Sequence, residues 1–155
     1  MPEVSRGVAF GDVDNDGDID FIVANMNGTP SLFRCDQRGS NHWMMFQTVG
    51  RQSNRDGIGT RITVETDDLT QVWEIKRTLG IYSVSDSRAH FGLGAASKAD
   101  RVVVRWPSGK VQEFKNVPAD FHYVVDEEEG LKRASVLSLD RTSSHPHPSS
   151  NTPSP

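Results

Sequence analysis

Apolar and polar residues alternate along most of the chain in short runs, which is the pattern of β-strands. In residues 61–65, for example, Ile62 and Val64 fall on one side and the polar residues on the other. The same alternation recurs in residues 101–106 and 121–126, and no segment has the period of about 3.6 residues of an amphipathic helix. The pattern therefore predicts an all-β protein with a sandwich-like or barrel-like domain.

One connection between these strands is specified by its turn residues. Pro107 and Gly109 follow the apolar run of residues 101–106. Proline presets the backbone angle φ that the second position of a tight turn requires, and glycine accepts the positive φ that side chains resist. We expect this turn to join residues 101–106 to residues 111–114 as a β-hairpin.

The N-terminal part of the chain carries a concentration of negative charge. Two short apolar runs, residues 7–10 and 19–25, flank a loop in which every second residue is an aspartate. These aspartates are Asp12, Asp14, Asp16, Asp18 and Asp20. Their carboxylates repel one another across short distances, and a cation at the centre of the loop would remove that repulsion.

Calcium fits this pattern because it takes about 6–8 oxygen ligands. Gly17 permits the sharp bend that wraps a loop around an ion. The expected ligands are the side chains of Asp12, Asp14, Asp16 and Asp20 and the backbone carbonyl of Asp18. The sequence therefore predicts a calcium site in this loop.

Two other interpretations of the loop stay open, a solvated acidic segment without an ion and a phosphatase site. Residues 10–14, a strand that ends in Asp-x-Asp, resemble the nucleophile loop of haloacid dehalogenase-like phosphatases. That resemblance implies that Asp12 attacks phosphorus and Asp14 acts as acid and base beside magnesium. Asp16 departs from the motif, and no helical segment follows for the parallel sheet that it requires. An EF-hand is excluded, because its twelfth position needs glutamate and is Val23 here.

The charge is distributed unevenly along the chain. The 155 residues have a net charge of −4, and all of it lies in residues 1–35, where six acidic residues accompany two arginines. Residues 36–155 hold fifteen acidic and fifteen basic residues without a basic cluster, so we expect no nucleic-acid partner. No run of about 18 apolar residues predicts a membrane span. Residues 1–10 lack the pattern of a secretory leader, and the lone Cys35 excludes an internal disulfide.

Two polar segments and three tryptophans allow both functional and structural interpretations. Residues 53–61 could bind a ligand, but Asn54 and an adjacent Arg–Asp pair also suit a turn before a strand. Residues 83–94 contain the residue types of a hydrolase triad without a Gly-x-Ser-x-Gly elbow, which favours a half-buried, hydrogen-bonded His90. The tryptophans could form a carbohydrate platform, although their apolar neighbours favour the core. They are Trp43, Trp73 and Trp106.

Longer stretches of the chain resemble two known domain types. Residues 8–25 are similar to an FG-GAP repeat, the integrin-α-type propeller blade whose inter-strand loop binds calcium. Residues 41–64, 81–94 and 102–114 resemble blocks of the ASPIC/UnbV domain, in the expected order. That domain follows FG-GAP propellers in cartilage acidic protein-like proteins, so the chain is similar to the C-terminal part of such a protein.

This resemblance implies an all-β fold in three parts. We expect a partial FG-GAP calcium-binding blade at residues 1–38, a β-sandwich-like ASPIC/UnbV domain at residues 39–130 and a disordered tail at residues 131–155. The FG-GAP calcium ligands correspond to the five aspartates named above, and no catalytic residue is implied. The charge run at residues 126–133 is expected to be solvated or to leave the fold.

The function implied is that of a non-enzymatic, calcium-binding interaction or adhesion module. It would belong to a secreted or cell-surface protein and have a protein or polysaccharide as its partner. Because a propeller needs several blades to close its ring, we expect the chain to be the C-terminal portion of a longer protein or a truncated gene product. An enzyme or biosynthetic accessory protein is the alternative, since one namesake of the domain is linked to enediyne biosynthesis.

Overall fold

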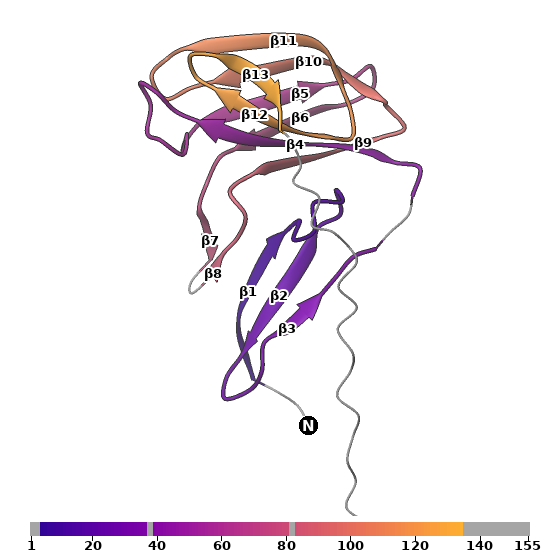
Figure 1. The fold of residues 1–155 in the computed structure, drawn as a ribbon, viewed down its shortest axis with the longest axis vertical. Helices are drawn as coiled ribbons and strands as arrows, with labels where there is room; N and C mark the ends of the chain where they lie inside the picture. The colour runs from indigo at the N-terminus through magenta and orange to yellow at the C-terminus, as the bar shows by residue number, and fades with distance from the viewer. Residues whose placement is uncertain (1–3, 37–38, 81–82, 135–155) are drawn as a thin grey trace, which may run out of the picture.

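The computed structural model of the chain describes residues 4–36, 39–80 and 83–134. These residues form thirteen β-strands and no helix, which confirms the predicted all-β fold (Figure 1). The strands are β1 (Ser5–Gly11), β2 (Asp20–Asn25), β3 (Ser31–Phe33), β4 (His42–Val49), β5 (Arg61–Glu65), β6 (Thr70–Glu74), β7 (Thr78–Gly80), β8 (Ser83–Val84), β9 (Ala89–Gly94), β10 (Lys98–Arg105), β11 (Val111–Pro118), β12 (Phe121–Asp126) and β13 (Gly130–Arg133). Within the described ranges there is no helix of the length and apolar character needed to cross a membrane.

Eight of the strands build a β-sandwich. One sheet has the strand order β11-β10-β5-β6 and the other has the order β13-β12-β4-β9. Side chains from both sheets meet in one apolar core, where Ile62 and Val64 of β5 expose 0% and 1% of their surface. The predicted inward side of that strand is therefore confirmed. The facing sheet contributes Met44, Phe46, Phe91, Tyr123 and Val125 to the core.

The predicted hairpin is confirmed between β10 and β11. Arg105 pairs with Val111 at its closed end, and the N–H of Gly109 donates to the carbonyl of Trp106 at 3.0 Å. Gly109 has a φ of +90°, a left-handed conformation that glycine adopts without a steric penalty. The indole N–H of the buried Trp106 donates to Gln112 at 2.9 Å, so the turn is anchored to the core.

A separate three-stranded sheet, in the order β1-β2-β3, lies beside the sandwich (Figure 1). A hairpin of two short strands, β7 and β8, extends from the sandwich along β1. The segment after β8 covers the edge of β1. There the N–H of Phe10 donates to the hydroxyl of Ser85 at 3.3 Å, and the N–H of Asp86 donates to the carbonyl of Phe10 at 2.8 Å. These bonds pair backbone groups on the open edge of β1 and hold the three-stranded sheet next to the sandwich.

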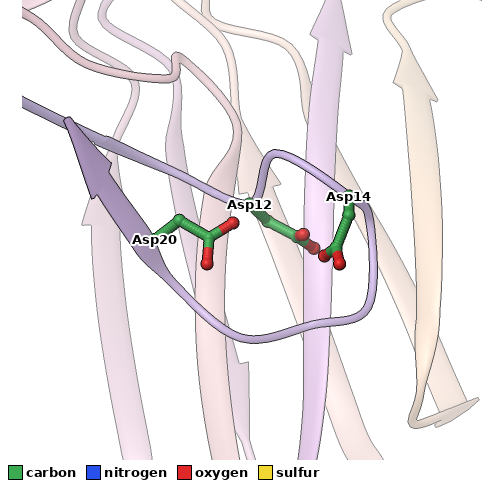
Figure 2. Close-up of side chains that lie close together, drawn as sticks. All are labelled: Asp12, Asp14 and Asp20. Carbon is green, nitrogen blue, oxygen red and sulfur yellow. The ribbon is translucent and has the colours of Figure 1, made fainter. Parts of the chain in front are cut away.

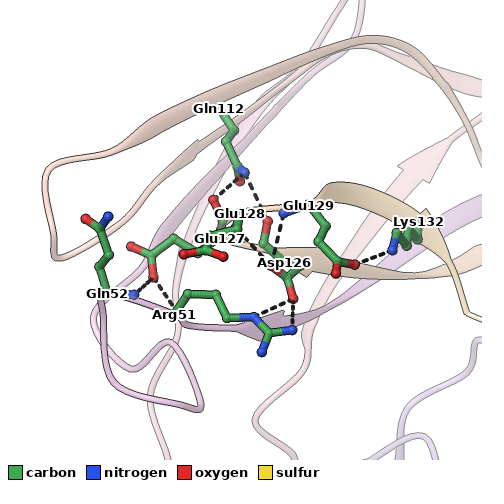
Figure 3. Close-up of polar contacts among 8 residues, drawn as sticks. All are labelled: Arg51, Gln52, Gln112, Asp126, Glu127, Glu128, Glu129 and Lys132. Atoms are coloured by element: carbon green, nitrogen blue, oxygen red, sulfur yellow. Dashed lines mark hydrogen bonds and ion pairs between the residues drawn. The ribbon is translucent and has the colours of Figure 1, made fainter.

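The charge of the acidic run after β12 predicts that it is solvated or leaves the fold. In the structure, part of this run is buried. Glu127 is completely buried. Its Oε2 accepts the backbone N–H groups of Arg51 and Gln52 at 2.6 and 2.8 Å (Figure 3). The same oxygen accepts the N–H of Ser53 at 2.8 Å. Its Oε1 accepts the hydroxyls of Ser53 and Ser108 at 2.8 and 2.5 Å. One carboxylate thus joins the end of β12 to the loop after β4 and to the β10–β11 turn.

Strand structure also continues past the predicted end of the domain. β13 pairs antiparallel with β12 as far as Arg133, three residues into the segment predicted as a disordered tail. The larger part of that segment, residues 135–155, lies outside the described residues. The sandwich sheet therefore includes the basic end of the charge run as an edge strand.

The buried carboxylate makes the stability of the fold depend on pH. Burial by itself would raise the pKa of Glu127, but the hydroxyl and amide donors, led by Ser108, outweigh it and lower the pKa from 4.5 to about 2. Because the folded pKa lies below the unfolded one, the ionised group stabilises the fold above pH 4.5. That contribution is lost as the pH falls from 4.5 toward 2.

Glu127→Gln should lower the free energy of unfolding by about 2 kcal/mol at neutral pH, because donors arranged around two carboxylate oxygens lose one acceptor. The variant should also lose less stability than the parent as the pH falls from 4.5 toward 2. Urea unfolding at a series of pH values measures both effects. Glu128→Gln, at the exposed neighbouring position, is the matched control. Equal losses in the two variants would contradict the prediction.

Candidate functional site

The loop between β1 and β2 is folded around the first of its aspartates. Oδ1 of Asp12 accepts the N–H of Asp16 at 3.1 Å, and Oδ2 accepts the N–H of Gly17 at 2.9 Å. Two residues in the left-handed region make the bend, Asn15 with a φ of +60° and Gly17 with a φ of +96°. Asparagine and glycine adopt this conformation most readily, so the local sequence explains the curled loop.

The last aspartate of the loop holds both of its ends. Oδ2 of Asp20 accepts the N–H of Val13 at 3.0 Å, and Oδ1 accepts the N–H of Cys35 at 2.8 Å. Asp20 exposes 0% of its surface, so its carboxylate depends on these bonds in place of water. Asp20 therefore ties the loop to the chain that leaves β3.

The loop brings carboxylates together in two overlapping groups. Oxygens of Asp12, Asp14 and Asp20 lie within 4.8 Å of one another, and Figure 2 shows the first two side chains pointing toward each other. Asp14, Asp16 and Asp36 form a second group with the same spacing. Asp14 belongs to both groups and links them. Four of the five predicted ligand residues therefore have side chains in one or both of these groups.

Asp18 lies within the acidic loop, whereas Asp36 lies after β3. Asp18 lies in neither group, and its N–H donates to Oδ1 of Asp16 at 3.0 Å. The ligand role of its carbonyl stays a prediction. Asp36 is not among the predicted ligands. Asp36 comes close to the loop because β3 runs antiparallel to β2 and pairs Phe33 with Phe21. The sequence signal that could have identified Asp36 is therefore the third short strand that precedes it.

The carboxylates of the loop are incompletely compensated. Oδ1 of Asp14 is buried and has no hydrogen-bond partner among the described residues, while its Oδ2 lies 3.4 Å from Nη1 of Arg34. Burial raises the pKa of Asp12, although the amides of Gly17 and Asp16 oppose that shift. A buried charged oxygen without a donor is costly unless a cation or a proton meets it. The site is therefore able to hold a divalent cation that prefers oxygen ligands.

One face of the loop lies on the sandwich. Gly17 packs so closely on the indole of Trp43 that an added Cβ atom would lie 2.1 Å from the ring. Nε2 of His90 lies 2.7 Å from the carbonyl of Gly17, and since a carbonyl only accepts, the imidazole donates. The predicted half-buried, hydrogen-bonded state of His90 is confirmed.

Arg88 clamps the same loop with its guanidinium group. It donates to the carbonyl of Asp12 at 2.8 Å and to Oδ1 of Asn15 at 2.7 Å. Its other N–H groups face the carboxylate of Asp86, 2.6 Å from Nε, and Nδ1 of His122, 3.4 Å from Nη1. Sequence reasoning missed this clamp, because Arg88 lies 76 positions from Asp12 and no local pattern connects the two.

The polar segment at residues 53–61 has a structural role. The side-chain amide of Asn54 makes two hydrogen bonds of 2.8 Å to the backbone of Ile58, as the turn interpretation predicts. Asp56 forms an ion pair with Arg77, whose Nη1 lies 3.3 Å from its Oδ2. The segment is therefore held by its own turn and by contacts to distant residues, among them Arg77 and Glu127.

The tryptophans differ in burial. Trp106 is in the core as predicted, with 4% of its surface exposed. Trp73 exposes 41%, so the core prediction is wrong for this residue, which lies on the edge strand β6. Together with Phe10, Met45 and His90 it lines a pocket of about 220 Å³ between the N-terminal sheet and the sandwich.

Comparisons with known proteins bear on the sandwich. Residues 50–132 match the model of a protein family, ASPIC and UnbV, which confirms the resemblance of that region. The match includes Arg88, His90 and His122, which face the aspartate loop, but not the loop itself. No curated protein matches the chain.

Gly17→Ala should displace the loop from the sandwich, because the added methyl group collides with Trp43 and a φ of +96° strains alanine. We expect the free energy of unfolding to fall by about 3 kcal/mol, measured by urea unfolding. Gly109→Ala is the matched control, since its φ is +90° and an added Cβ would meet no atom within 4 Å. The control should lose only about 1 kcal/mol. Equal losses would mean that the contact with Trp43 does not hold the loop.

Proposed function

Because the chain belongs to the ASPIC and UnbV family and joins that domain to a folded aspartate loop, we propose that it is a non-enzymatic, calcium-binding interaction module of a secreted or cell-surface protein. The observation that carries this proposal is the group formed by Asp12, Asp14 and Asp20, whose oxygens lie within 4.8 Å of one another. One oxygen of Asp14 is buried without a hydrogen-bond partner in the described part of the chain. The binding partner of the module would be a protein or a polysaccharide.

The donor set suits calcium. Both groups consist of carboxylates, and no histidine or cysteine of the described residues belongs to either of them. Calcium accepts irregular shells of about 6–8 oxygens, whereas magnesium demands near-octahedral geometry and retains water. The residues that would hold the ion are Asp12, Asp14, Asp16, Asp20 and, through its carbonyl, Asp18. When bound, calcium would supply the positive charge that these carboxylates lack.

The extracellular location is supported by the expected strength of such a site. Extracellular modules bind calcium with dissociation constants of about 10⁻⁴–10⁻³ M. Here Asp12 and Asp20 already use their oxygens as acceptors for backbone N–H groups, which weakens their donation to an ion. A weak site of this kind would be filled outside the cell, where calcium is abundant, and not in the cytosol.

The three-stranded sheet is proposed to be part of an FG-GAP propeller blade in a longer protein similar to cartilage acidic protein-like proteins. Phe10, Phe21 and Phe33 lie side by side on one face, and Ile22 pairs with Leu32 on the other. These five side chains expose between 37% and 54% of their surface. A sheet that is apolar on both faces needs cover on both, which neighbouring blades of a propeller would provide.

A non-enzymatic role is supported by the structural partners of the residues that could suggest an enzyme. Ser85 and Asp86 bond to the edge of β1, and His90 bonds to the aspartate loop. In the phosphatase alternative Asp12 would be the nucleophile, yet both of its oxygens accept N–H groups of its own loop. The described residues also contain no helix for the parallel sheet that such phosphatases require.

Calcium should raise the melting temperature of EDTA-treated protein. A ligand that binds only the folded state stabilises it by RT ln(1 + [L]/Kd), about 2.7 kcal/mol at a hundredfold excess over Kd. Asp14→Asn should remove most of this shift, because Asp14 belongs to both carboxylate groups. Asp68→Asn, in the exposed connection between β5 and β6, is the control and should keep the full shift. Scanning calorimetry with calcium, and separately with magnesium, measures these effects.

Equal calcium shifts in Asp14→Asn and the parent would contradict the proposed site. A shift produced by magnesium alone would favour the phosphatase interpretation of the loop. Titration calorimetry on the same preparations tests the location, since a Kd near 10⁻⁷ M would suit a cytosolic calcium sensor rather than an extracellular module.

A further inference from the structure

We propose that the sandwich completes the calcium site. His122 positions Asp12 from outside the loop, so that cation binding and the docking of the loop on the sandwich strengthen each other. This inference rests on the proposed calcium site and adds residues of the other sheet system to it. Neither the aspartate pattern nor the family match assigns a role to these residues.

His122 directs a buried nitrogen toward the cation group. Its side chain exposes 9% of its surface, and its Nδ1 lies 3.4 Å from Nη1 of Arg88. Because arginine can only donate, Nδ1 is the acceptor and the hydrogen of the neutral ring is on Nε2. Nε2 has no hydrogen-bond partner within the described part of the chain and lies 3.7 Å from Oδ2 of Asp12, which exposes 0% of its side chain.

This geometry gives His122 the role of a positioning residue. A carboxylate that binds a metal is held in orientation by further hydrogen bonds, and the loss of such a partner weakens metal binding by about 10–100-fold. The ring of His122 is itself held edge-on against Trp43, with 4.9 Å between ring centroids. A small movement of Asp12 toward this fixed ring would have two effects. The carboxylate would accept the imidazole N–H, and this bond would fix the orientation of the carboxylate.

Two more side chains of the sandwich hold the backbone of the loop. Arg88 donates to the carbonyl of Asp12 at 2.8 Å, and His90 donates to the carbonyl of Gly17 at 2.7 Å. The loop conformation that groups the carboxylates is therefore the one in which these bonds form. An undocked loop would keep its internal bonds but lose all of these external constraints.

Thermodynamic linkage makes the relation reciprocal. If docking of the loop raises the calcium affinity by some factor, bound calcium raises the equilibrium constant of docking by the same factor. The N–H of Asp86 reports on docking, because it donates to the carbonyl of Phe10 across the boundary between the two sheet systems. Hydrogen exchange at this amide follows local opening of that boundary.

The calcium affinity of the full chain can be measured by displacement of terbium, whose luminescence is excited through a nearby tryptophan. Trp43 is the ring in contact with the loop. His122→Phe keeps a ring beside Trp43 but removes both nitrogens, so calcium affinity should fall about tenfold. His122→Gln retains an N–H donor and should lose less. His42→Phe is the matched control, because His42 pairs with Asp120, an aspartate outside the loop, at 2.7 Å.

The reciprocal effect is measured by amide hydrogen exchange with and without calcium. Calcium should slow exchange of the Asp86 amide several-fold in the parent and less in His122→Phe. The amide of Val103, on the inner strand β10, reports opening of the sandwich itself. Comparing exchange at the Asp86 and Val103 amides therefore separates opening of the boundary from opening of the sandwich. A merely structural role of His122 would change the melting temperature without changing the calcium dependence at Asp86.

Arg88→Lys provides the same test if His122→Phe does not unfold cooperatively. Its control is Arg101→Lys, since Arg101 forms comparable ion pairs with Glu65 and Glu113, at 3.1 and 3.0 Å, on the other sheet. Weaker calcium binding in Arg88→Lys than in its control supports the inference. Unchanged calcium affinity in His122→Phe and Arg88→Lys would overturn it and leave the proposed function standing. A parent chain that binds no calcium would overturn both.

Discussion

The contact between Gly17 and Trp43 is the constraint on which the docking of the N-terminal sheet on the sandwich depends. No side chain fits between the loop and the indole ring, and the carbonyl of the same glycine accepts a bond from His90. Because the loop joins β1 to β2, its docking fixes the N-terminal sheet against the sandwich. The bonds between Phe10 and the segment after β8 continue the same boundary along the edge of β1. Arg88 adds two more bonds across this boundary, to the carbonyl of Asp12 and to Oδ1 of Asn15.

The charged groups that connect separate loops of the structure follow one rule. A buried charge is tolerated when hydrogen bonds replace its hydration. Glu127 collects donors from the loop after β4 and from the β10–β11 turn, and Arg88 distributes its donors over the aspartate loop and its own segment. Most of these partners belong to loops, so the two side chains fix the course of the chain. Asp14 departs from this rule, since one of its buried oxygens has no donor among the described residues, and the proposed ion site rests on this departure.

Strands, inward faces and the β10–β11 hairpin could be predicted because alternation and turn chemistry are local properties of the sequence. The curled aspartate loop is local in the same sense. The partners of the loop could not be predicted, because strand pairing brings them from distant segments: β3 returns Asp36, and the parallel pairing of β12 with β4 sets His122 beside Trp43. The exposure of Trp73 has a similar cause, since an apolar position is indistinguishable from a core position until its strand is known to be an edge.

The family match begins at residue 50, yet the folding unit of the sandwich has to begin earlier. β4 is an inner strand of its sheet, paired with β12 on one side and β9 on the other, and its Met44 and Phe46 each expose 0% of their surface. Truncating a single side chain of this kind costs about 2–5 kcal/mol, against a total stability of about 5–15 kcal/mol for a domain. The sandwich therefore cannot dispense with β4. Since Trp43 lies on the same strand, the residues that complete the core also carry the surface on which the aspartate loop docks, and the geometry of the acidic site depends on the integrity of the sandwich.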